Sequence, residues 1–598
     1  MAQTNRSSRA HRGQTWAVAA AVCLVVWFVF RGSIGGAMLQ WDDDTNLQYN
    51  EHLRALSVQN LHWMFTDASY VRRYVPLGWL ALAVDYRLFG PGPRSFHALN
   101  LALHCADAAL VFLLILKLMG MPPGGRARPL GANALLAAAA GALLWAVHPL
   151  RVEAVARASG TYCQAVFFIL LSILAYLGSV SMAAGGAARR MMLGASVLAF
   201  AMSLTTYPLA LGYAGVLVVL DVLVLARIPP GAAAWGGRES RGVWIEKIPF
   251  LAVTAAVLGV TLAARYQAGG VWEPPPTLAQ FGVGSRILQA CYVWAYYLWK
   301  PLLPLHLSPV YTTLVWFRPD APVFVGSAAA VAGITALLWW RRRRWPGTLA
   351  LWLCHLALLV PVLGLTEHPH YANDRYSYLV AIPVSVSIAM ILLGRGGRPV
   401  LRRAALAAAF GLVAVCGMAS SAQVGIWRDS ETLFRAMLDR LGADPYRADI
   451  LRRLGRYYRG GERRAEAVAA FQEAVKAAPE WSVGHYELGS MLVEAGETGR
   501  GIAELEEALR ITPGMPDARF DLSRALFSAG RIPEAAAAME EVVRARPTAD
   551  SYYDLSVMYG REGRMAEARR ACDEALRLDP FHARALALRR ALAEAGAR

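Results

Sequence analysis

The chain has 598 residues, of which 56% are hydrophobic and 17% are charged, and its mean hydropathy is +0.35. This composition excludes an ordinary soluble protein, because apolar stretches of about 20 residues recur along the chain as in multi-span membrane proteins. The net charge of +17 does not indicate nucleic-acid binding, since the Arg and Lys residues form no single basic stripe. Many lie in short clusters beside apolar stretches, which is typical of cytoplasmic loops: Arg126 and Arg128, Arg189 and Arg190, Arg341 to Arg344, and Arg395 to Arg403.

The N-terminal segment begins with a basic tail, residues 1–15, followed by an apolar run from Trp16 to Phe30. A cleaved signal peptide has the same pattern, but the further apolar runs favour an uncleaved signal anchor. We therefore predict a cytoplasmic tail over 1–15 and a multi-span membrane domain over 16–422.

Eleven spans are predicted in this domain, each long enough to cross about 30 Å of hydrocarbon. They are 16–38, 96–119, 131–149, 161–182, 189–206, 207–227, 247–265, 322–340, 346–366, 376–393 and 404–422. The fifth and sixth are separated at Pro208, because proline breaks a helix. Eleven crossings place the outer loop 39–95, the outer segment 266–321 and everything after about residue 423 on the side opposite the N-terminus.

The segment 284–303 is ambiguous, because it is apolar enough to span but contains Arg286, Lys300 and five Tyr or Trp residues. If it crossed, the cluster Arg341 to Arg344 would fall outside. Aromatic and basic residues are typical of helices that lie in the membrane interface. We therefore expect this segment to lie flat at the outer surface.

Prolines repeat near the C-terminus with a period of 34 residues: Pro445, Pro479, Pro513 and Pro547, with Pro580 following at 33. This period is the signature of tetratricopeptide (TPR) helix pairs. We predict a linker over 423–444 and a TPR domain over 445–598, with about four repeats and a terminal helix. Such arrays usually bind a polypeptide, and the alternative is a stabilising or dimerising cap without a ligand.

Small residues recur at matched places in these repeats. Ala467, Gly501, Ala535 and Ala568 each lie 12 residues before the closing proline. Gly496, Gly530 and Gly563 lie 17 before it, where the turn between two helices needs a permissive backbone. The first repeat has Glu462 at that place, so its turn is expected to differ.

Three adjacent carboxylates, Asp42, Asp43 and Asp44, follow the first predicted span. Their mutual repulsion raises pKa values unless a metal, a cationic group, a nearby Arg or water compensates. On this local pattern alone, a solvated acidic turn is the simplest interpretation.

Other polar residues fall at predicted outer ends of spans. Glu153 follows His148 after the third span, and Asp374 and Arg375 precede the tenth. Arg375 is suited to hold a phosphate, and the alternative is an interfacial anchor paired with Asp374. The remaining candidates share one face of the second span, where polar residues serve function or interhelical hydrogen bonds: His97, Asn100 and His104. No tight His and Cys group is present, so no metal is assigned.

The motifs occur in a distinctive order. They are Trp41-Asp42-Asp43, Val75-Pro76-Leu77-Gly78-Trp79, Asp85-Tyr86-x-Leu88-Phe89-Gly90, His97-x-x-Asn100-x-x-x-His104, His148-Pro149-Leu150-x-x-Glu153-Ala154-Val155, Asp374-Arg375-Tyr376-x-Tyr378-Leu379 and Trp427-Arg428-Asp429-Ser430-x-x-Leu433-Phe434. This series, together with the repeats, resembles the transmembrane and TPR-containing protein O-mannosyltransferases and their bacterial relatives. The resemblance covers nearly the whole chain.

The resemblance implies an all-α protein with a membrane body of the GT-C glycosyltransferase type, followed by an α-solenoid. It implies a polyprenyl-phosphate sugar donor, with Asp42 or Asp43 as the catalytic carboxylate and Glu153 as a second acid. Arg375 becomes a candidate for the lipid phosphate, with His97, His148 and Asp374 as further donor-binding candidates. The expected activity is transfer of a sugar such as mannose to hydroxyls of an exported protein or other envelope acceptor.

Several charged positions of the family pattern are absent. Gly160-Thr161-Tyr162-Cys163 stands where relatives usually carry a charged Gly-Arg-x-Asp, and Thr205-Thr206-Tyr207-Pro208 lacks the usual Lys. Val75 stands where the family often has His, and Val380 stands where it often has Pro. Lost charges near a phosphate-bearing donor point to an altered donor or a weakened enzyme.

Two other functions compete with glycosyl transfer. A non-catalytic, membrane-anchored TPR scaffold that binds envelope proteins is favoured by the lost charges and opposed by Asp42, Glu153 and Arg375. A transporter has little support beside the long outer loop and the solenoid. The high Ala and Arg content suggests a GC-rich bacterial source, and hence an inner membrane protein with its TPR domain in the periplasm.

Overall fold

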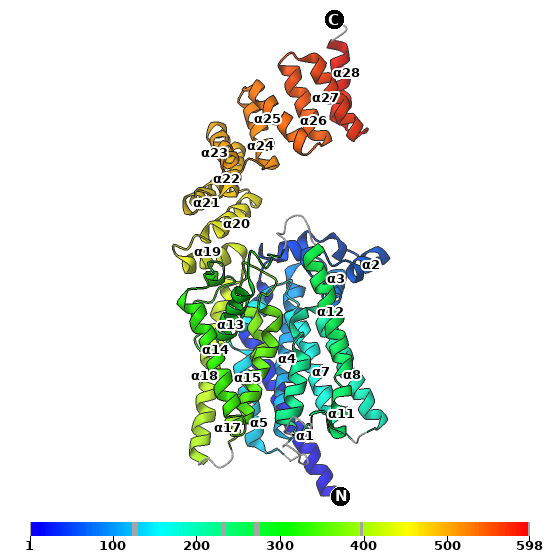
Figure 1. Cartoon of the computed structure of the whole chain (residues 1–598), viewed down its shortest axis with the longest axis vertical. Coiled ribbons are helices and arrows are strands. Elements are labelled where there is room, and N and C mark those ends of the chain that lie inside the picture. Colours follow the sequence, from blue (N-terminus) through cyan, green and yellow to red (C-terminus); the bar gives the residue numbers. More distant parts are fainter. Residues whose placement is uncertain are drawn as a thin grey trace. The chain divides into compact units, whose positions relative to one another are not determined.

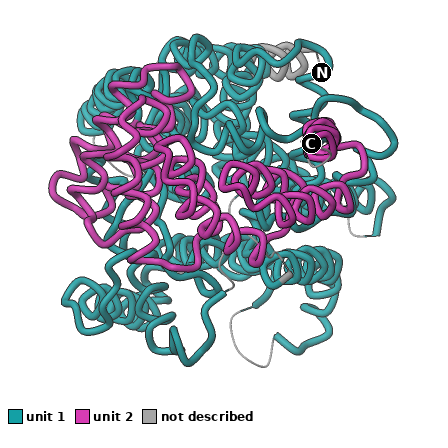
Figure 2. The backbone as a smooth tube through the Cα atoms, turned by 90° about the horizontal axis from the view of Figure 1, so that it is seen from above, with its two compact units in different colours: residues 1–433 teal, residues 434–598 magenta. Residues whose placement is uncertain are grey.

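The computed structural model describes residues 2–121, 130–182, 185–229, 235–267, 275–394 and 399–595. These residues form helices joined by turns and loops, with no strand among them, which confirms the all-α prediction. Contacts divide the chain into unit 1, Met1–Leu433, and unit 2, Phe434–Arg598, which Figure 2 colours separately. Of the basic clusters, Arg126, Arg128, Arg395 and Arg398 lie outside the described residues.

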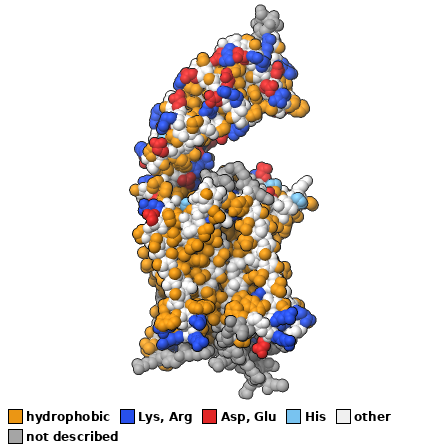
Figure 3. Space-filling view, in the orientation of Figure 1, with side chains coloured by type: hydrophobic (Ala, Val, Ile, Leu, Met, Phe, Trp, Pro, Cys, Tyr) orange, Lys and Arg blue, Asp and Glu red, His pale blue; other side chains and the backbone are white. Residues whose placement is uncertain are grey.

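Unit 1 contains seven helices that are long and apolar enough to cross a membrane, among the residues that the structure describes. They are α1 (Ala2–Phe30), α4 (Pro93–Met119), α7 (Tyr162–Val180), α8 (Ala187–Thr206), α12 (Ile248–Gln267), α14 (Pro322–Trp340) and α18 (Pro399–Ile426), labelled in Figure 1. Two bent pairs raise the number to nine if each forms one broken span. Apolar side chains cover much of the side of unit 1 seen in Figure 3.

The first bent pair lies in the interior of unit 1, and the second packs against it. One consists of α5 (Ala132–Ala146) and the segment Pro149–Ala156, which includes α6 (Val152–Ala156), and the other of Asp374–Val380, which includes α16 (Ser377–Val380), and α17 (Ile382–Leu393). Small residues let α5 and α17 approach closely, since a Cβ on Gly141 would lie 2.7 Å from the Ser385 carbonyl oxygen. Close approach through small residues is how helices associate in membranes.

Two predicted spans are shorter than expected. The segment 207–227 forms a 3₁₀ turn and then α9 (Tyr213–Val219), which continues as a π-helical turn to Val224, and the segment 346–366 forms α15 (Pro346–Leu359) followed by a 3₁₀ turn. A Cβ on Gly212 would lie 1.8 Å from the Ala357 carbonyl oxygen, so these two segments touch backbone to backbone. The expected break at Pro208 is confirmed, because α8 ends at Thr206.

The remaining helices of unit 1 lie in its loops: α2 (Val58–Thr66), α3 (Pro76–Phe89), α11 (Arg238–Ile245) and α13 (Val283–Trp299). Helix α13 covers most of the segment with the ambiguous prediction, and it is not among the candidate spans. Its buried face packs on α14 and α15. Whether it lies flat at a membrane surface stays a prediction.

Unit 2 is built from helix pairs. After α19 (Ser430–Leu441), which begins in unit 1, these are α20 (Arg447–Gly460) with α21 (Arg464–Ala477), α22 (Ser482–Glu494) with α23 (Thr498–Ile511), α24 (Pro516–Ser528) with α25 (Ile532–Ala545), and α26 (Ala549–Arg561) with α27 (Met565–Leu578), followed by α28 (Ala583–Ala595). Each closing proline falls between pairs, so the repeat register read from the sequence is confirmed.

The turns inside the pairs also follow the sequence. Gly496, Gly530 and Gly563 have φ of +87°, +79° and +79°, a region that glycine enters without strain. In the first repeat Glu462 adopts φ +59° and its turn has the same backbone hydrogen bonds as the glycine turns, so the expectation of a different turn is wrong; Glu462 places a side chain in a region that glycine favours. The small residues Ala467, Ala535 and Ala568 are fully buried between paired helices.

Candidate functional site

The predicted outer segments of unit 1 meet at one end of it. Asn46 donates from Nδ2 to Ser159 Oγ at 3.3 Å, and Arg72 donates from Nη2 to the Arg265 carbonyl at 2.9 Å. Tyr297 Oη donates to the Asn373 carbonyl at 2.6 Å. These bonds join the segment 39–95 to 148–160 and to the end of α12, and the segment 266–321 to 367–375. His148 bonds the Pro301 carbonyl and Glu153 bonds the Arg375 N–H, which links the two groups, so the candidate residues lie at the same end.

The two leading carboxylates have different surroundings. Asp42 has φ +77°, a strained backbone for a residue with a side chain, and its half-exposed carboxylate accepts from Arg157 Nη1 at 2.5 Å. Asp43 is fully buried, and it accepts from the backbone N–H of Ser159 at 2.8 Å and of Leu39 at 3.1 Å. Burial raises the pKa of Asp43. These hydrogen bonds and the charge of Arg157 lower it, but by less than burial raises it. Asp42 is therefore the accessible carboxylate, and Asp43 fixes the turn to the loop at Ser159.

Asp44 has a local role. Its Oδ1 accepts from the N–H of Thr45 at 2.9 Å, and it begins a wide helical turn, Asp44–Gln48. The triple-aspartate turn is therefore held by neighbouring backbone and by Arg157, which matches the compensating Arg considered from the sequence.

Glu153 and Arg375 form a buried ion pair, and Glu153 Oε2 also accepts from the Arg375 N–H at 2.9 Å. Arg375 pairs with Glu153 rather than with Asp374, which corrects the anchor alternative. Asp374 instead accepts from Tyr311 Oη at 2.7 Å. Arg375 Nε donates to Tyr162 Oη at 3.3 Å, so its guanidinium is surrounded by protein groups.

Two arginines that sequence reasoning missed complete this cluster. Arg157 is 4% exposed and pairs with Asp42. The guanidinium of Arg73 lies 5.6 Å from the Tyr207 ring, and Tyr207 and Asp42 raise its pKa while burial opposes them. Nothing in the sequence near either residue marks it, because the chain segments that bury them come from elsewhere. Arg73, Arg157 and Arg375 together give this end of unit 1 an anion-binding character.

The histidine candidates separate into different roles. His148 Nε2 bonds the Pro301 carbonyl at 2.9 Å, so it anchors the outer segment rather than facing the carboxylates. His97 is buried against the backbone at Gly36, where a Cβ would lie 3.1 Å from its Nε2. The structure thus brings together Asp42, Asp43, Glu153 and Arg375, and it places both histidines beside this group as packing or anchoring residues.

The polar face of α4 makes interhelical hydrogen bonds. Asn100 Nδ2 donates to the Arg157 carbonyl at 2.8 Å, and His104 bonds Tyr378 Oη at 2.7 Å and the Ala146 carbonyl at 3.0 Å. Tyr378 Oη also lies 2.8 Å from Asp107 Oδ2. Asn100 thereby holds the loop that carries Arg157, which is a positioning role.

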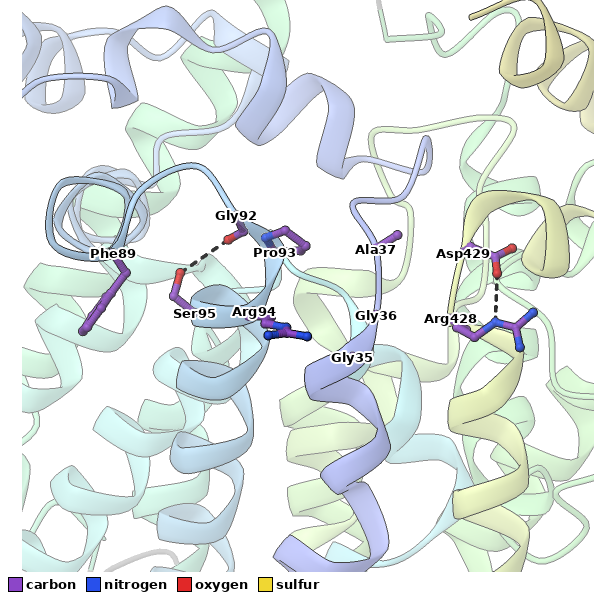
Figure 4. A pocket seen from close by; sticks show the side chains of 10 residues that line it. All are labelled: Gly35, Gly36, Ala37, Phe89, Gly92, Pro93, Arg94, Ser95, Arg428 and Asp429. Atoms are coloured by element: carbon purple, nitrogen blue, oxygen red, sulfur yellow. Dashed lines mark hydrogen bonds and ion pairs between the residues drawn. The ribbon is translucent and has the colours of Figure 1, made fainter. Parts of the chain in front are cut away.

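Two cavities flank this cluster. One, of about 20 Å³, is lined by Arg73, Arg157, Ser159 and Tyr207, and it has room for about one water molecule. The other, of about 740 Å³, is lined by Gly35, Gly36, Arg94, Arg428 and neighbours. In Figure 4 Arg94 and Arg428 lie on either side of the segment Gly35–Ala37, and Arg428 pairs with Asp429. No group of His, Cys, Asp or Glu among the described residues is arranged to hold a metal ion.

Comparison with known proteins locates the repeats. Residues 452–516 and 520–583 match the sequence model of the tetratricopeptide repeat family. No curated protein sequence matches the chain. The protein is therefore an all-helical chain with TPR repeats in unit 2 and, in unit 1, several apolar helices that could span a membrane.

Several solved structures with similarity to this chain are described as TPR proteins. YrrB, described as having an unusual peptide-binding site, is 24% identical, with 27% of this chain and 82% of YrrB covered and a TM-score of 0.25. MamA is 24% identical, with 26% of this chain and 90% of MamA covered and a TM-score of 0.24. A TPR protein from Parabacteroides merdae is 16% identical, with 27% and 64% covered and a TM-score of 0.26.

Proposed function

We propose that this protein is a membrane-anchored scaffold whose TPR unit binds a polypeptide segment that carries a positively charged group. The observation behind this proposal is a row of aromatic and acidic side chains on the first helices of three successive repeats. The pairs Tyr486 with Glu487, Phe520 with Asp521, and Tyr553 with Asp554 occupy matched positions, each directly before a repeat leucine. We call these six residues the aromatic–acidic row.

The aromatic members of the row combine packing with exposure. Tyr486, Phe520 and Tyr553 are partly buried and pack against the core of the repeats. Half-buried aromatic rings on a rigid scaffold are typical contact residues in protein recognition. The first helices are also tied to one another, since Ser490 Oγ donates to Asp521 Oδ2 at 3.0 Å.

The acidic members of the row are unequally neutralised. Glu487 is buried and already paired with Arg456. Burial raises the pKa of both Asp521 and Asp554, and the charge of Arg524 lowers each. Arg459 also acts on Asp521 and Arg584 on Asp554, but these two guanidiniums already pair with Glu494 and Asp550. A Lys, Arg or N-terminal amine of a bound polypeptide would add positive charge beside the two carboxylates.

The test compares the full-length protein with Asp521→Asn/Asp554→Asn and with Glu497→Gln/Glu534→Gln. The second variant is a control that removes the same charge from exposed ion pairs at the N-terminal ends of second helices. A pool of Lys- and Arg-containing peptides is titrated beside the same peptides with Gln. The first variant should bind the basic pool about tenfold more weakly, and the control should bind normally. Equal loss in both variants, or no preference for basic peptides, contradicts the proposal.

Membrane anchoring is the other half of the proposal. Among the described residues of unit 1, seven to nine apolar spans with basic clusters beside them support integration into a membrane with the TPR unit outside it. The Ala37 N–H donates to the Arg428 carbonyl at 2.8 Å, so the ends of α1 and α18 meet beside the carboxylates. Alkaline extraction should leave the full-length protein in the membrane, and release of the protein would refute this half.

A second candidate function is glycosyl transfer from a polyprenyl-phosphate donor, which the arginine-rich cluster around Asp42 favours. Transfer to a hydroxyl needs a base for its proton and positive charge near the departing phosphate. Asp42 supplies an accessible carboxylate, and Arg73 and Arg157 supply positive charge. The cavity between them has room only for water, so a donor requires movement of the 39–75 loop or entry from the side of Arg94 and Arg428.

The assay for this second function incubates purified protein with polyprenyl-phosphate mannose and an acceptor peptide. Release of polyprenyl phosphate that depends on Asp42 supports the enzyme. A membrane-embedded protein that binds basic peptides but never turns over the donor supports the scaffold alone.

A further inference from the structure

A third cavity lies at the other end of unit 1 from Asp42. It has a volume of about 520 Å³ and is bounded by α9, α11 and the first turn of α12. The far end of α12 carries Arg265, whose carbonyl accepts from Arg72 at the carboxylate end. The cavity is therefore separated from the candidate site by the length of a spanning helix.

One side of this cavity is apolar and open. Val218 lines it from α9, and Ile248 and Leu251 line it from α12. Ile248 is 59% exposed and Leu251 is 54% exposed, although both belong to a candidate span. Exposed apolar side chains on a spanning helix contact lipid acyl chains, so this side is suited to hydrocarbon.

Two indole rings form the rim of the cavity. Trp244 Nε1 donates to the Trp235 carbonyl at 2.8 Å, and the two ring centroids are 5.7 Å apart. Tryptophan gathers at the boundary between hydrocarbon and headgroups, because its ring is apolar and its N–H is polar. The rim therefore has the chemistry of the headgroup level of a bilayer.

The remaining wall of the cavity is positively charged. Arg241 lines it, and among the described residues no ion pair or hydrogen bond of its guanidinium occurs. Lys247 also lines it and is held at 2.6 Å from Asp221 Oδ2 in a buried network. That network contains three cations and two carboxylates, so it adds positive charge behind the wall: Arg189, Arg227, Lys247, Asp221 and Glu246.

Further Lys and Arg residues near the cavity add to its positive charge. Figure 3 shows Lys and Arg side chains gathered at the lower end of unit 1. Arg189 and Arg190 belong to a basic cluster predicted to be cytoplasmic, where anionic lipids attract such clusters. Glu239 is on α11 as well but is not among the residues that line the cavity.

We propose that this cavity is a binding site for an anionic phospholipid. The phosphate lies beside Arg241, the indoles of Trp235 and Trp244 lie at the headgroup level, and the acyl chains lie against Ile248 and Leu251. Basic pockets between spanning helices are the common form of such sites. The inference rests on the membrane anchoring of unit 1 proposed above, and it is independent of peptide binding and of glycosyl transfer.

The experiment uses full-length protein in detergent and native mass spectrometry, with dioleoyl phosphatidylglycerol and dioleoyl phosphatidylcholine titrated separately. Wild type should retain one phosphatidylglycerol more tightly than phosphatidylcholine. Arg241→Gln should weaken phosphatidylglycerol about fivefold, the effect of one interfacial cation. The matched control is Arg238→Gln, which removes the same charge from the same helix, is exposed, and does not line the cavity; it should bind within about twofold of wild type.

The outcomes separate the two proposals. Equal retention of the two lipids by wild type, or an equal loss in Arg238→Gln and Arg241→Gln, overturns the lipid site even when the protein resists alkaline extraction. Release of the protein by alkaline extraction overturns the anchoring itself. If Arg241→Gln unfolds, Trp244→Leu replaces it, since loss of the rim should lower phosphatidylglycerol retention while the protein stays monodisperse.

Discussion

Glu153 and Arg375, 222 residues apart in the sequence, form a buried ion pair that is reinforced by a hydrogen bond from the Arg375 backbone N–H to the same carboxylate. Both side chains are buried, so water cannot take the place of either partner in the ion pair. The pair therefore links α6 to the turn before α16, and with them the two bent helix pairs of unit 1. It also means that Arg375 can bind a phosphate only by sharing its guanidinium with Glu153.

Breaking this pair should be costly. Glu153→Gln leaves a buried guanidinium without its counter-charge, so we expect a loss of about 3–5 kcal/mol. Glu153→Gln/Arg375→Gln should cost less than the sum of the single variants, because it leaves no lone charge. Thermal unfolding of the detergent-solubilised full chain measures both. The exposed pair of Glu51 and Arg54 is the control, and Glu51→Gln should change stability by less than about 1 kcal/mol. Additive single effects would argue against a coupled pair.

If unit 1 is an enzyme, substitutions of Asp42 and of Asp43 should have different effects on donor turnover and on stability. Asp42→Asn keeps the shape of an accessible carboxylate and removes a base, so donor turnover should fall about 10²–10⁴-fold. Stability should also fall, because the buried Arg157 loses its counter-charge, but by less than in Glu153→Gln, since Asp42 is half-exposed to water. Asp43→Asn replaces one acceptor by an amide that faces a backbone N–H, so it should destabilise the fold by about 1–3 kcal/mol. Turnover and thermal unfolding of the same preparations distinguish the roles. A stable Asp43→Asn protein without turnover would reverse the assignment.

Much of the architecture could be predicted because it rests on local patterns. The proline period and the turn glycines give the register of unit 2, since each repeat contacts mainly its neighbours. Pro208 and the apolar runs give most of the helices of unit 1. These features depend on residues close in sequence, where helix geometry and backbone preference act directly.

The cluster around Asp42 could be predicted only in part. The carboxylates can be recognised in the sequence because three charges follow an apolar span. Arg73 and Arg157 cannot, because segments far away in the sequence bury them and bring them to the cluster. The same reason explains the broken segment at 207–227, because its backbone meets Ala357 at Gly212. Neither contact leaves a pattern within a window of sequence.

The close packing inside the second repeat gives a matched pair of glycine variants. A Cβ on Gly489 would lie 2.9 Å from the Gly501 carbonyl oxygen, and backbone cannot yield as a side chain does. Gly489→Ala should therefore destabilise α22 and α23 by about 1–3 kcal/mol. Gly499→Ala meets nothing within 4 Å and should be neutral or slightly stabilising. Hydrogen exchange of α22 and α23 peptides in the full-length protein measures both, and equal protection in the two variants would show that the helices do not pack this closely.

The carboxylate of Asp554 should make the fourth repeat less stable as pH rises. Burial raises its pKa above the value of about 3.9 that applies to an unfolded chain, although Arg524 and Arg584 oppose the shift. The folded state thus favours the protonated form, and this stabilisation is complete below about pH 4 and is lost as pH rises through the higher, folded pKa. Asp554→Asn removes the titration, so its protection should exceed that of wild type near neutral pH and approach it near pH 4.

Hydrogen exchange of α26 in the full-length protein, corrected for the intrinsic effect of pH, measures this difference. Neighbouring Asp550 titrates with the opposite sign, because its hydrogen bond with His582 and the charge of Arg584 lower its pKa. Comparison of wild type with Asp554→Asn at each pH cancels that contribution, since Asp550 is present in both. A difference that stays constant between about pH 4 and pH 7 would mean that Asp554 is solvated, and the aromatic–acidic row would then lack the partly buried carboxylate that a basic peptide is proposed to meet.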